Sequence, residues 1–213
     1  VACGGGSTGS CNSTTGNRIM TSPDGITWTS RSAAGNDDIW NDLTYSNGIF
    51  VAVGNGALGS SVMTSPDGIT WTARSAPEAN SWISVTYGAG LFVAVSSNGT
   101  NRVMTSPDGI TWTARSNPDS SGDLLSIAYG NGLFVIVEGT SGSYSVQTSP
   151  DGITLTSRSA AGNDDTWLSI TYSNGIFVAV GSGNGAAGDR VMTSPDGITW
   201  TARSAAGDND DWR

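Results

Sequence analysis

The chain has no histidine, no lysine and only two cysteines among its 213 residues. These three side chains supply much of the general acid–base chemistry and many of the metal sites in proteins. Acid–base catalysis by histidine or lysine and metal sites built from histidine and cysteine are therefore excluded. The chain also lacks any run of 18 apolar residues, so the sequence predicts no membrane-spanning helix.

Positive charge is scarce, because all nine basic residues are arginine and they face 18 acidic residues. The formal net charge of −9 argues against nucleic-acid binding, since phosphates need a basic surface. It is compatible with cationic partners, with Ca²⁺ and with neutral ligands such as sugars.

The two cysteines, Cys3 and Cys11, flank a segment rich in glycine and serine. We expect a disulfide between them, which indicates an oxidising compartment; two free thiols are the alternative. Asn12 and Asn98 each begin a glycosylation sequon. These features predict an extracellular or cell-surface protein.

A heptapeptide, Ser-Pro-Asp-Gly-Ile-Thr-Trp, occurs five times, and only the fourth copy differs, with Leu155 in place of tryptophan. The copies start 43, 41, 43 and 45 residues apart, at Ser22, Ser65, Ser106, Ser149 and Ser194. A fixed period of this length indicates a repeat architecture. Residues that recur in every copy are expected to be structural, and function is expected where the copies differ.

The repeat over residues 167–203 predicts four strands, at 167–172, 176–180, 190–193 and 198–203. A Ser-Asn-Gly turn separates the first two, and Ser-Pro-Asp-Gly separates the last two. Four antiparallel strands in about 40 residues are typical of a β-propeller blade. A β-solenoid is the alternative, although its coils do not require two hairpin turns per repeat.

We therefore predict an all-β fold, a five-bladed β-propeller of four-stranded antiparallel blades in one domain, residues 1–213. The expected blades are 40–74, 82–115, 124–158, 167–203, and a fifth split between the termini, 212–213 with 1–31. In each complete repeat, 11 residues separate the first residue of the first strand from the first valine of the second. By this spacing the split blade lacks about nine residues. They correspond to residues 84–92, which form most of the first strand and its turn in another repeat.

Three explanations of this gap stay open. The parent chain is longer, a neighbouring molecule supplies the strand through the exposed edge, or the blade has no inner strand.

Length varies in only two connections, the one between the second and third strands and the one between blades. In a four-stranded meander both fall at the same end of the blades, opposite the invariant turns. Variable loops on one face are usually the binding surface.

The repeated turn resembles the Asp-box, or BNR repeat, of sialidase-like and related propellers, shortened by one residue between aspartate and glycine. The resemblance covers all five repeats. It implies a turn role for Asp24, Asp67, Asp108, Asp151 and Asp196, whose carboxylates would bond turn backbone with the serine. It also implies that the tryptophan of the motif packs in the blade.

Asp-box propellers include glycosidases, lectins, receptors and assembly factors, so the resemblance does not specify an activity. A sialidase needs a tyrosine nucleophile and an acid at one asymmetric site. The arginines and tyrosines of this chain are instead nearly symmetric across the repeats, which favours a protein that is not an enzyme.

Two groups of residues beside the inter-blade loops are candidate ligand contacts. Trp40, Trp82 and Trp167 open successive blades and either pack between blades or expose indole rings for stacking on sugars. The loop residues Asp37, Asp38, Asn80, Asp164 and Asp165 either bind sugar hydroxyls or Ca²⁺ or are simply solvated. No other cofactor is predicted.

The leading hypothesis is a lectin-like propeller that binds glycans or glycoproteins through the variable-loop face. The alternative is a structural, self-assembly or protein-interaction module, whose incomplete blade is completed by a neighbouring subunit and which forms a homo-oligomer in that way.

Overall fold

A computed structural model describes residues 2–3, 19–34, 39–55, 61–117, 122–139, 145–161, 165–183 and 190–204. In this part of the chain every element is a β-strand, and no helix has the length and apolar character needed to cross a membrane. The strands form four four-stranded sheets and one three-stranded sheet. This all-β arrangement of antiparallel meanders is that of a five-bladed β-propeller, as predicted.

The chain divides into two compact units. The first consists of Val1–Tyr87 with Leu91–Ala114, and the second of Gly88–Gly90 with Arg115–Arg213. Most of the features that bear on function lie in the first unit.

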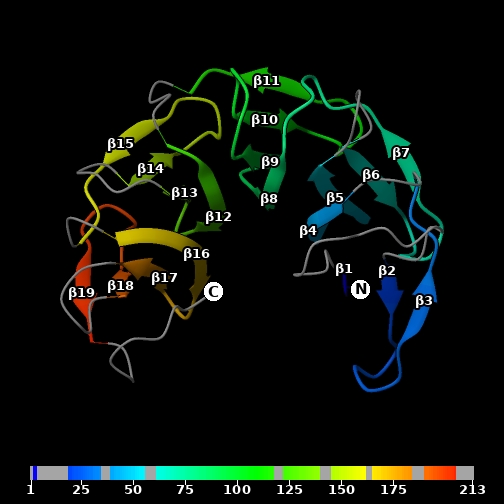
Figure 1. The fold of residues 1–213 in the computed structure, drawn as a ribbon, viewed down its shortest axis with the longest axis horizontal. Coiled ribbons are helices and arrows are strands. Elements are labelled where there is room, and N and C mark those ends of the chain that lie inside the picture. The colour runs from blue at the N-terminus through cyan, green and yellow to red at the C-terminus, as the bar shows by residue number, and fades with distance from the viewer. Residues whose placement is uncertain are drawn as a thin grey trace. The chain divides into compact units, whose positions relative to one another are not determined.

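Each four-stranded sheet follows the chain in order, as the labels in Figure 1 show. The first consists of β4 (Ile39–Ser46), β5 (Ile49–Asn55), β6 (Val62–Ser65) and β7 (Thr72–Arg74). The second consists of β8 (Trp82–Gly88), β9 (Leu91–Ser96), β10 (Val103–Ser106) and β11 (Thr113–Arg115).

The other two complete sheets lie mainly in the second unit. One consists of β12 (Leu124–Gly130), β13 (Leu133–Glu138), β14 (Val146–Ser149) and β15 (Thr156–Arg158). The other consists of β16 (Asp165–Ser173), β17 (Ile176–Gly183), β18 (Val191–Ser194) and β19 (Thr201–Arg203). The fourth strands are shorter than predicted, because the Ile-Thr-Trp of each repeat belongs to the turn.

The three-stranded sheet has the order β1 (Ala2–Cys3), β2 (Ile19–Thr21) and β3 (Thr29–Arg31). Ala2 is paired with Met20, as Ala52 is with Met63 in the first complete sheet. β1 is therefore a second strand, and the sheet is the described part of the split blade.

The hairpin between the first and second strands turns on two residues with positive φ, such as Asn47 (53°) and Gly48 (78°). Asparagine and glycine tolerate this conformation, so a Ser-Asn-Gly sequence forms a type I′ hairpin. Ala89 stands where the other three hairpins have asparagine, and with a φ of 48° it takes the same conformation.

One feature of the first strands was not predicted. The pairing register shifts between Trp40 and Asp42, and likewise between Trp167 and Ser169. This β-bulge lets Trp167 and Ile170, three residues apart, both be buried at 1% and 7% exposure. Burial does not alternate strictly along this strand, because a bulge adds one residue to one side of the ladder.

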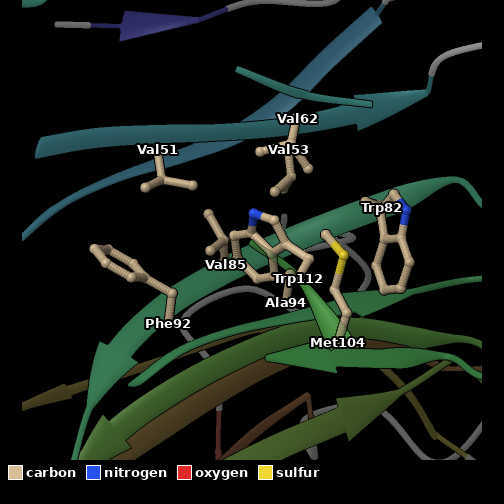
Figure 2. Close-up of a cluster of buried hydrophobic side chains, with 9 residues drawn as sticks. All are labelled: Val51, Val53, Val62, Trp82, Val85, Phe92, Ala94, Met104 and Trp112. Atoms are coloured by element: carbon tan, nitrogen blue, oxygen red, sulfur yellow. The ribbon is translucent and has the colours of Figure 1, made fainter. Parts of the chain in front are cut away.

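The core lies between consecutive sheets. One cluster joins Val53 and Val62 of the first complete sheet to Trp82, Phe92 and Met104 of the second, as Figure 2 shows. Similar clusters join Ile19 to Trp40 and Val146 to Trp167. Within each unit, neighbouring blades thus bury apolar side chains against one another, which makes the packing of one blade depend on its neighbour.

Candidate functional site

The three tryptophans proposed as sugar platforms are buried. Trp40 and Trp82 are 0% exposed and Trp167 is 1% exposed. Each packs with the alanine and methionine of the next two strands, as Trp40 does with Ala52 and Met63. Since no indole face is accessible, these residues hold blades together and cannot stack on a ligand.

The candidate loop residues fall into two groups. Asp37, Asp38 and Asp164 lie outside the described residues. Of Asp165 only the backbone is described, at the start of β16 and paired with Gly183 of β17. Within the described ranges, no group of three acidic, histidine or cysteine side chains is arranged to hold a metal ion. The predicted disulfide between Cys3 and Cys11 also involves an undescribed residue, because Cys11 lies outside these ranges.

Asn80 is 6% exposed and ties two loops together. Its side-chain amide donates to the Asn101 carbonyl at 2.9 Å, and Glu78 accepts a 3.1 Å hydrogen bond from the Asn101 backbone N–H. Asn98 accepts from the Ser81 backbone N–H at 2.7 Å. The amide of Asn80 is therefore used within the protein, which favours a structural role.

The repeated turns are held by their own serine and aspartate. In the first turn, Asp24 accepts hydrogen bonds from the backbone N–H groups of Ile26 and Thr27, both at 2.8 Å. Ser22 donates to the same carboxylate at 2.9 Å and accepts from Gly25. The other four turns keep the bond from serine to aspartate and the two backbone bonds to the carboxylate, so the turn is a local unit.

These bonds lower the pKa of each turn aspartate, because backbone N–H donors stabilise the ionised carboxylate. For Asp151 the bonds from Thr154 and Ile153 lower the pKa to about 2. A carboxylic acid that donates a proton near neutral pH needs a raised pKa. The lowered pKa values of the turn aspartates therefore fit a structural role.

The tryptophan of the turn packs between blades. Trp71 packs against the cluster of Ile19, Trp40, Ala52 and Met63, as Ala33 and Ala34 of the preceding connection also do. Trp112 belongs to the cluster against which Ala76 packs. Trp112 is only 8% exposed, whereas Trp28, its equivalent beside the three-stranded sheet, is 44% exposed.

The three-stranded sheet has further exposed positions. Met20 is 43% exposed, whereas the methionines in the same position of three complete sheets, Met63, Met104 and Met192, are 0% exposed. In those sheets the first-strand tryptophan shares a cluster with the methionine. Met20 is exposed at the equivalent position, and Trp212, which the repeat spacing assigns to the first strand of this blade, lies outside the described residues.

The turn next to this sheet is also uncovered. Gly68, Gly109, Gly152 and Gly197 are buried, and Gly25 is exposed. A Cβ placed on Gly109 or Gly197 would approach the ring of Phe92 or Phe177, whereas one placed on Gly25 would meet nothing within 4 Å. The nearest neighbour of this Cβ at Gly109 would be Val51 of the preceding blade, at 2.7 Å, with Phe92 at 3.5 Å.

The neighbouring strand β4 is exposed on the same side. β1 lies beside β4, as β13 lies beside β16 in the second unit. Tyr45 of β4 is 58% exposed, but its three equivalents are half-buried. Leu43 is half-buried, whereas its equivalents Val85 and Ile170 are 5% and 7% exposed.

These positions share one unit. Met20, Gly25, Trp28, Leu43 and Tyr45 all lie in the first unit, and Leu43 and Tyr45 belong to β4, which lies beside β1. Within the described ranges, β2 is the only strand that pairs with β1. The incomplete blade was predicted from spacing, but the exposure of Tyr45 and Leu43 was not, because it depends on the neighbouring blade.

Comparison with protein-family models and with curated proteins finds no match. Several solved structures have a similar fold. Virginiamycin B lyase from Staphylococcus aureus is 16% identical with a TM-score of 0.71 over 84% of this chain. YCF48 from Cyanidioschyzon merolae is 16% identical with a TM-score of 0.57 over 80% of this chain. YCF48 bound to D1 peptide is 16% identical with a TM-score of 0.58 over 83%.

The chain spans 59% of the length of the lyase structure and 57% and 56% of the two YCF48 structures. At these identities the likeness shows the fold alone. The lectin hypothesis is wrong: its tryptophan platforms are buried, and the similar structures are a lyase and YCF48. Because one of them is an enzyme, the absence of enzymatic activity stays a prediction, as do the Asp-box assignment and the extracellular location.

Proposed function

We propose that this protein is a protein-interaction module whose incomplete blade receives a β-segment from a neighbouring polypeptide. The observation that carries the proposal is the 43% exposure of Met20, at a position that is fully buried in three complete blades. An exposed strand edge is a template for pairing with another chain. Here the edge adjoins an apolar side chain that the missing strand would cover.

The energetics support this role. Burying an apolar side chain contributes about 1.5–3 kcal/mol, and the incoming segment would cover Met20, Trp28 and Tyr45 together. Backbone pairing with β1 adds hydrogen bonds that do not depend on the partner's side chains. The similar YCF48 structure with a bound D1 peptide is consistent with a propeller of this kind taking a peptide partner.

A labelled synthetic peptide with the sequence of residues 82–92, the equivalent hairpin of a complete blade, tests the proposal. We expect saturable binding to the whole protein by fluorescence polarisation. Met20→Lys should abolish it, because the lysine would place a charge under the incoming tryptophan. Ile198→Lys is the matched control, since Ile198 is 44% exposed on a turn of the second unit.

Two outcomes would contradict the proposal. One is a wild-type protein that does not bind the peptide, and the other is a Met20→Lys variant that binds it equally well. The intact mass of the native protein adds a third check, because a longer polypeptide that supplies this hairpin itself would leave no place for a partner.

Light scattering then identifies the neighbouring polypeptide. A mass of two or more chains that falls to one on addition of the peptide indicates a second copy of this protein. A single-chain mass together with peptide binding indicates a different protein.

A further inference from the structure

A groove in the first unit lies between the end of β7 and the turn that precedes β11. It has a volume of about 450 Å³ and is lined by residues 73–77 and 110–112. None of these residues belongs to β1, β2 or β3. Pockets for small ligands have volumes of roughly 300–1,000 Å³, so the groove is large enough to hold one.

Apolar side chains make up much of this lining. Trp112 is 8% exposed and belongs to the core cluster of Val62 and Met104, as Figure 2 shows. Ala76 packs against the same cluster. Ile110 is 40% exposed. An apolar body placed in the groove would cover this exposed side chain, which the hydrophobic effect favours.

Hydrogen bonds fix the turn side of the groove. Asp108 accepts bonds from the backbone N–H groups of Ile110 and Thr111, at 2.8 and 2.9 Å. The indole N–H of Trp112 donates to the Gly109 carbonyl at 3.0 Å. Because the protein's own bonds hold this side, little conformational freedom is left for a ligand to remove, and binding costs less.

The one charged side chain in the lining is that of Arg74. Its Nε–H donates to the Thr64 hydroxyl at 2.9 Å. This bond orients the guanidinium and uses one of its five N–H donors. The other four are on the two terminal nitrogens, which together can bind both oxygens of a carboxylate.

The protein does not supply a carboxylate at this place. No aspartate or glutamate lines the groove, and Arg74 makes no ion pair with another described residue. Glu78, next to Pro77, accepts a 3.1 Å hydrogen bond from the Asn101 backbone N–H instead. Since the chain has 18 acidic residues and none lines the groove, the guanidinium charge is available to an external anion.

We propose that this groove binds a ligand that joins a carboxylate to a compact apolar body. The carboxylate pairs with the terminal nitrogens of Arg74, and the apolar body lies against Ile110 and Trp112. The C-terminus of a polypeptide that ends in apolar residues and a small organic acid share this chemistry. The site is separate from the edge of β1, so it does not depend on the proposed function.

A titration of the whole protein with 4-phenylbutyrate tests the proposal. The chain has nine arginines and no lysine, so the arginine Nε–H signals form a small set in a proton–nitrogen NMR spectrum. The signal that Arg74→Gln removes is that of Arg74, and it should shift saturably with the acid. The neutral amide 4-phenylbutanamide should bind at least about 10-fold more weakly, because it cannot form a charge-assisted pair.

Substitution of the arginine should separate binding from structure. Arg74→Gln should weaken 4-phenylbutyrate binding by about 10-fold or more, and Arg74→Lys should weaken it less, because lysine keeps the charge without the planar fork. Arg203→Gln is the matched control, since Arg203 makes the same bond, to Thr193 at 2.9 Å, in the second unit. Both glutamine variants should lose similar stability, but only Arg74→Gln should lose affinity.

The apolar part of the site has its own variants. Ile110→Ala should weaken binding by about 3- to 10-fold through the loss of apolar contact. Ile110→Glu should abolish it, because a second carboxylate would repel that of the ligand. Ile198→Glu is the control, since Ile198 has the same place in a turn of the second unit and is 44% exposed. Circular dichroism checks that the variants fold.

A tripeptide identifies the source of the carboxylate. If acetyl-Ala-Ala-Phe with a free C-terminus binds more tightly than 4-phenylbutyrate and its C-terminal amide does not, the natural ligand is a polypeptide C-terminus. If 4-phenylbutyrate binds more tightly, the ligand is a small organic acid. Both results support the proposed chemistry of the groove.

Three results would overturn the proposal: no shift of the Arg74 signal with either acid at millimolar concentrations, equal affinity for acid and amide, or undiminished binding by Arg74→Gln. Met20→Lys separates this site from the proposed function. That variant should keep its affinity for 4-phenylbutyrate while it loses the hairpin peptide, so the failure of one proposal leaves the other standing.

Discussion

Met20 and Met63 occupy the same place in the repeat, the middle of a third strand paired with an alanine. Met63 is fully buried under Trp40, whereas Met20 is 43% exposed. The two turns that follow are nearly identical in sequence and in the hydrogen bonds of their aspartates. The difference between the complete and incomplete blades therefore lies in the packing and leaves the turns unchanged.

The largest expected effect is on the two methionines themselves. Met63→Ala should lower the free energy of unfolding by about 2–5 kcal/mol, because it leaves a cavity in the core. Met20→Ala should change it by about 0.5 kcal/mol or less, as at other exposed positions. Urea denaturation measures both, and equal effects would mean that Met20 is already covered in solution.

Supplying the missing hairpin should make the incomplete blade resemble the complete ones. At 100 times its dissociation constant, the 82–92 peptide should stabilise the protein by about 2.7 kcal/mol. The thermal midpoint of wild type should rise with peptide concentration, while that of Met20→Lys should stay constant. A rise in both would show binding at another site.

The sheet β12–β15 offers a comparison among complete blades. It has Leu124, Ile136 and Gln147, all 0% exposed, where the first complete sheet has Trp40, Ala52 and Met63. Leu124→Trp alone should overpack this core and cost about 1–3 kcal/mol. Adding Ile136→Ala should recover most of that loss. Chemical denaturation measures the free energy of unfolding of each variant, and losses that simply add would show that the two positions are independent.

The turns should respond to acid alike in both kinds of blade. The pKa of Asp151 is lowered from 3.8 to about 2, and that of Asp24 is lowered by the same backbone bonds. The stabilising effect of ionised Asp151 is present above pH 3.8 and is lost as pH falls through about 2, and that of Asp24 is likewise lost as pH falls below 3.8. Asp24→Asn and Asp151→Asn should each flatten the acid side of a stability–pH curve.

The smallest effect concerns the strand beside the incomplete blade. Asp42 stands where the other first strands have serine, and burial raises its pKa above 3.8 despite bonds from Val85 and Ser84. Its ionisation therefore disfavours the folded state as pH rises above 3.8. Asp42→Ser should match wild type near pH 3 and be slightly more stable at pH 7, and the opposite trend would contradict this.

Local features of the fold could be predicted from the sequence. The period predicted the blades, and the Ser-Asn-Gly and Ser-Pro-Asp-Gly sequences predicted the turns. Turn geometry depends on φ preferences and on hydrogen bonds within a few residues. Such interactions are present in the sequence itself, which is why these predictions agree with the structure.

The candidate site could be predicted only in part. The sequence favoured packing between blades for Trp40, Trp82 and Trp167 but left stacking on sugars open, since both roles need a large aromatic ring. The tertiary structure decided for packing, because clusters between consecutive blades leave these rings 0–1% exposed. The β-bulge after Trp40 was missed for a similar reason, since register depends on the partner strand.

The sequence by itself determined the repeat and the turns, which follow from local conformational preferences. Only the tertiary structure decided which side chains are buried. Met20, Trp28, Leu43 and Tyr45 resemble their repeat equivalents in sequence and differ from them in burial. Burial is set by the residues that the fold places alongside a side chain, and those residues belong to other strands and other blades.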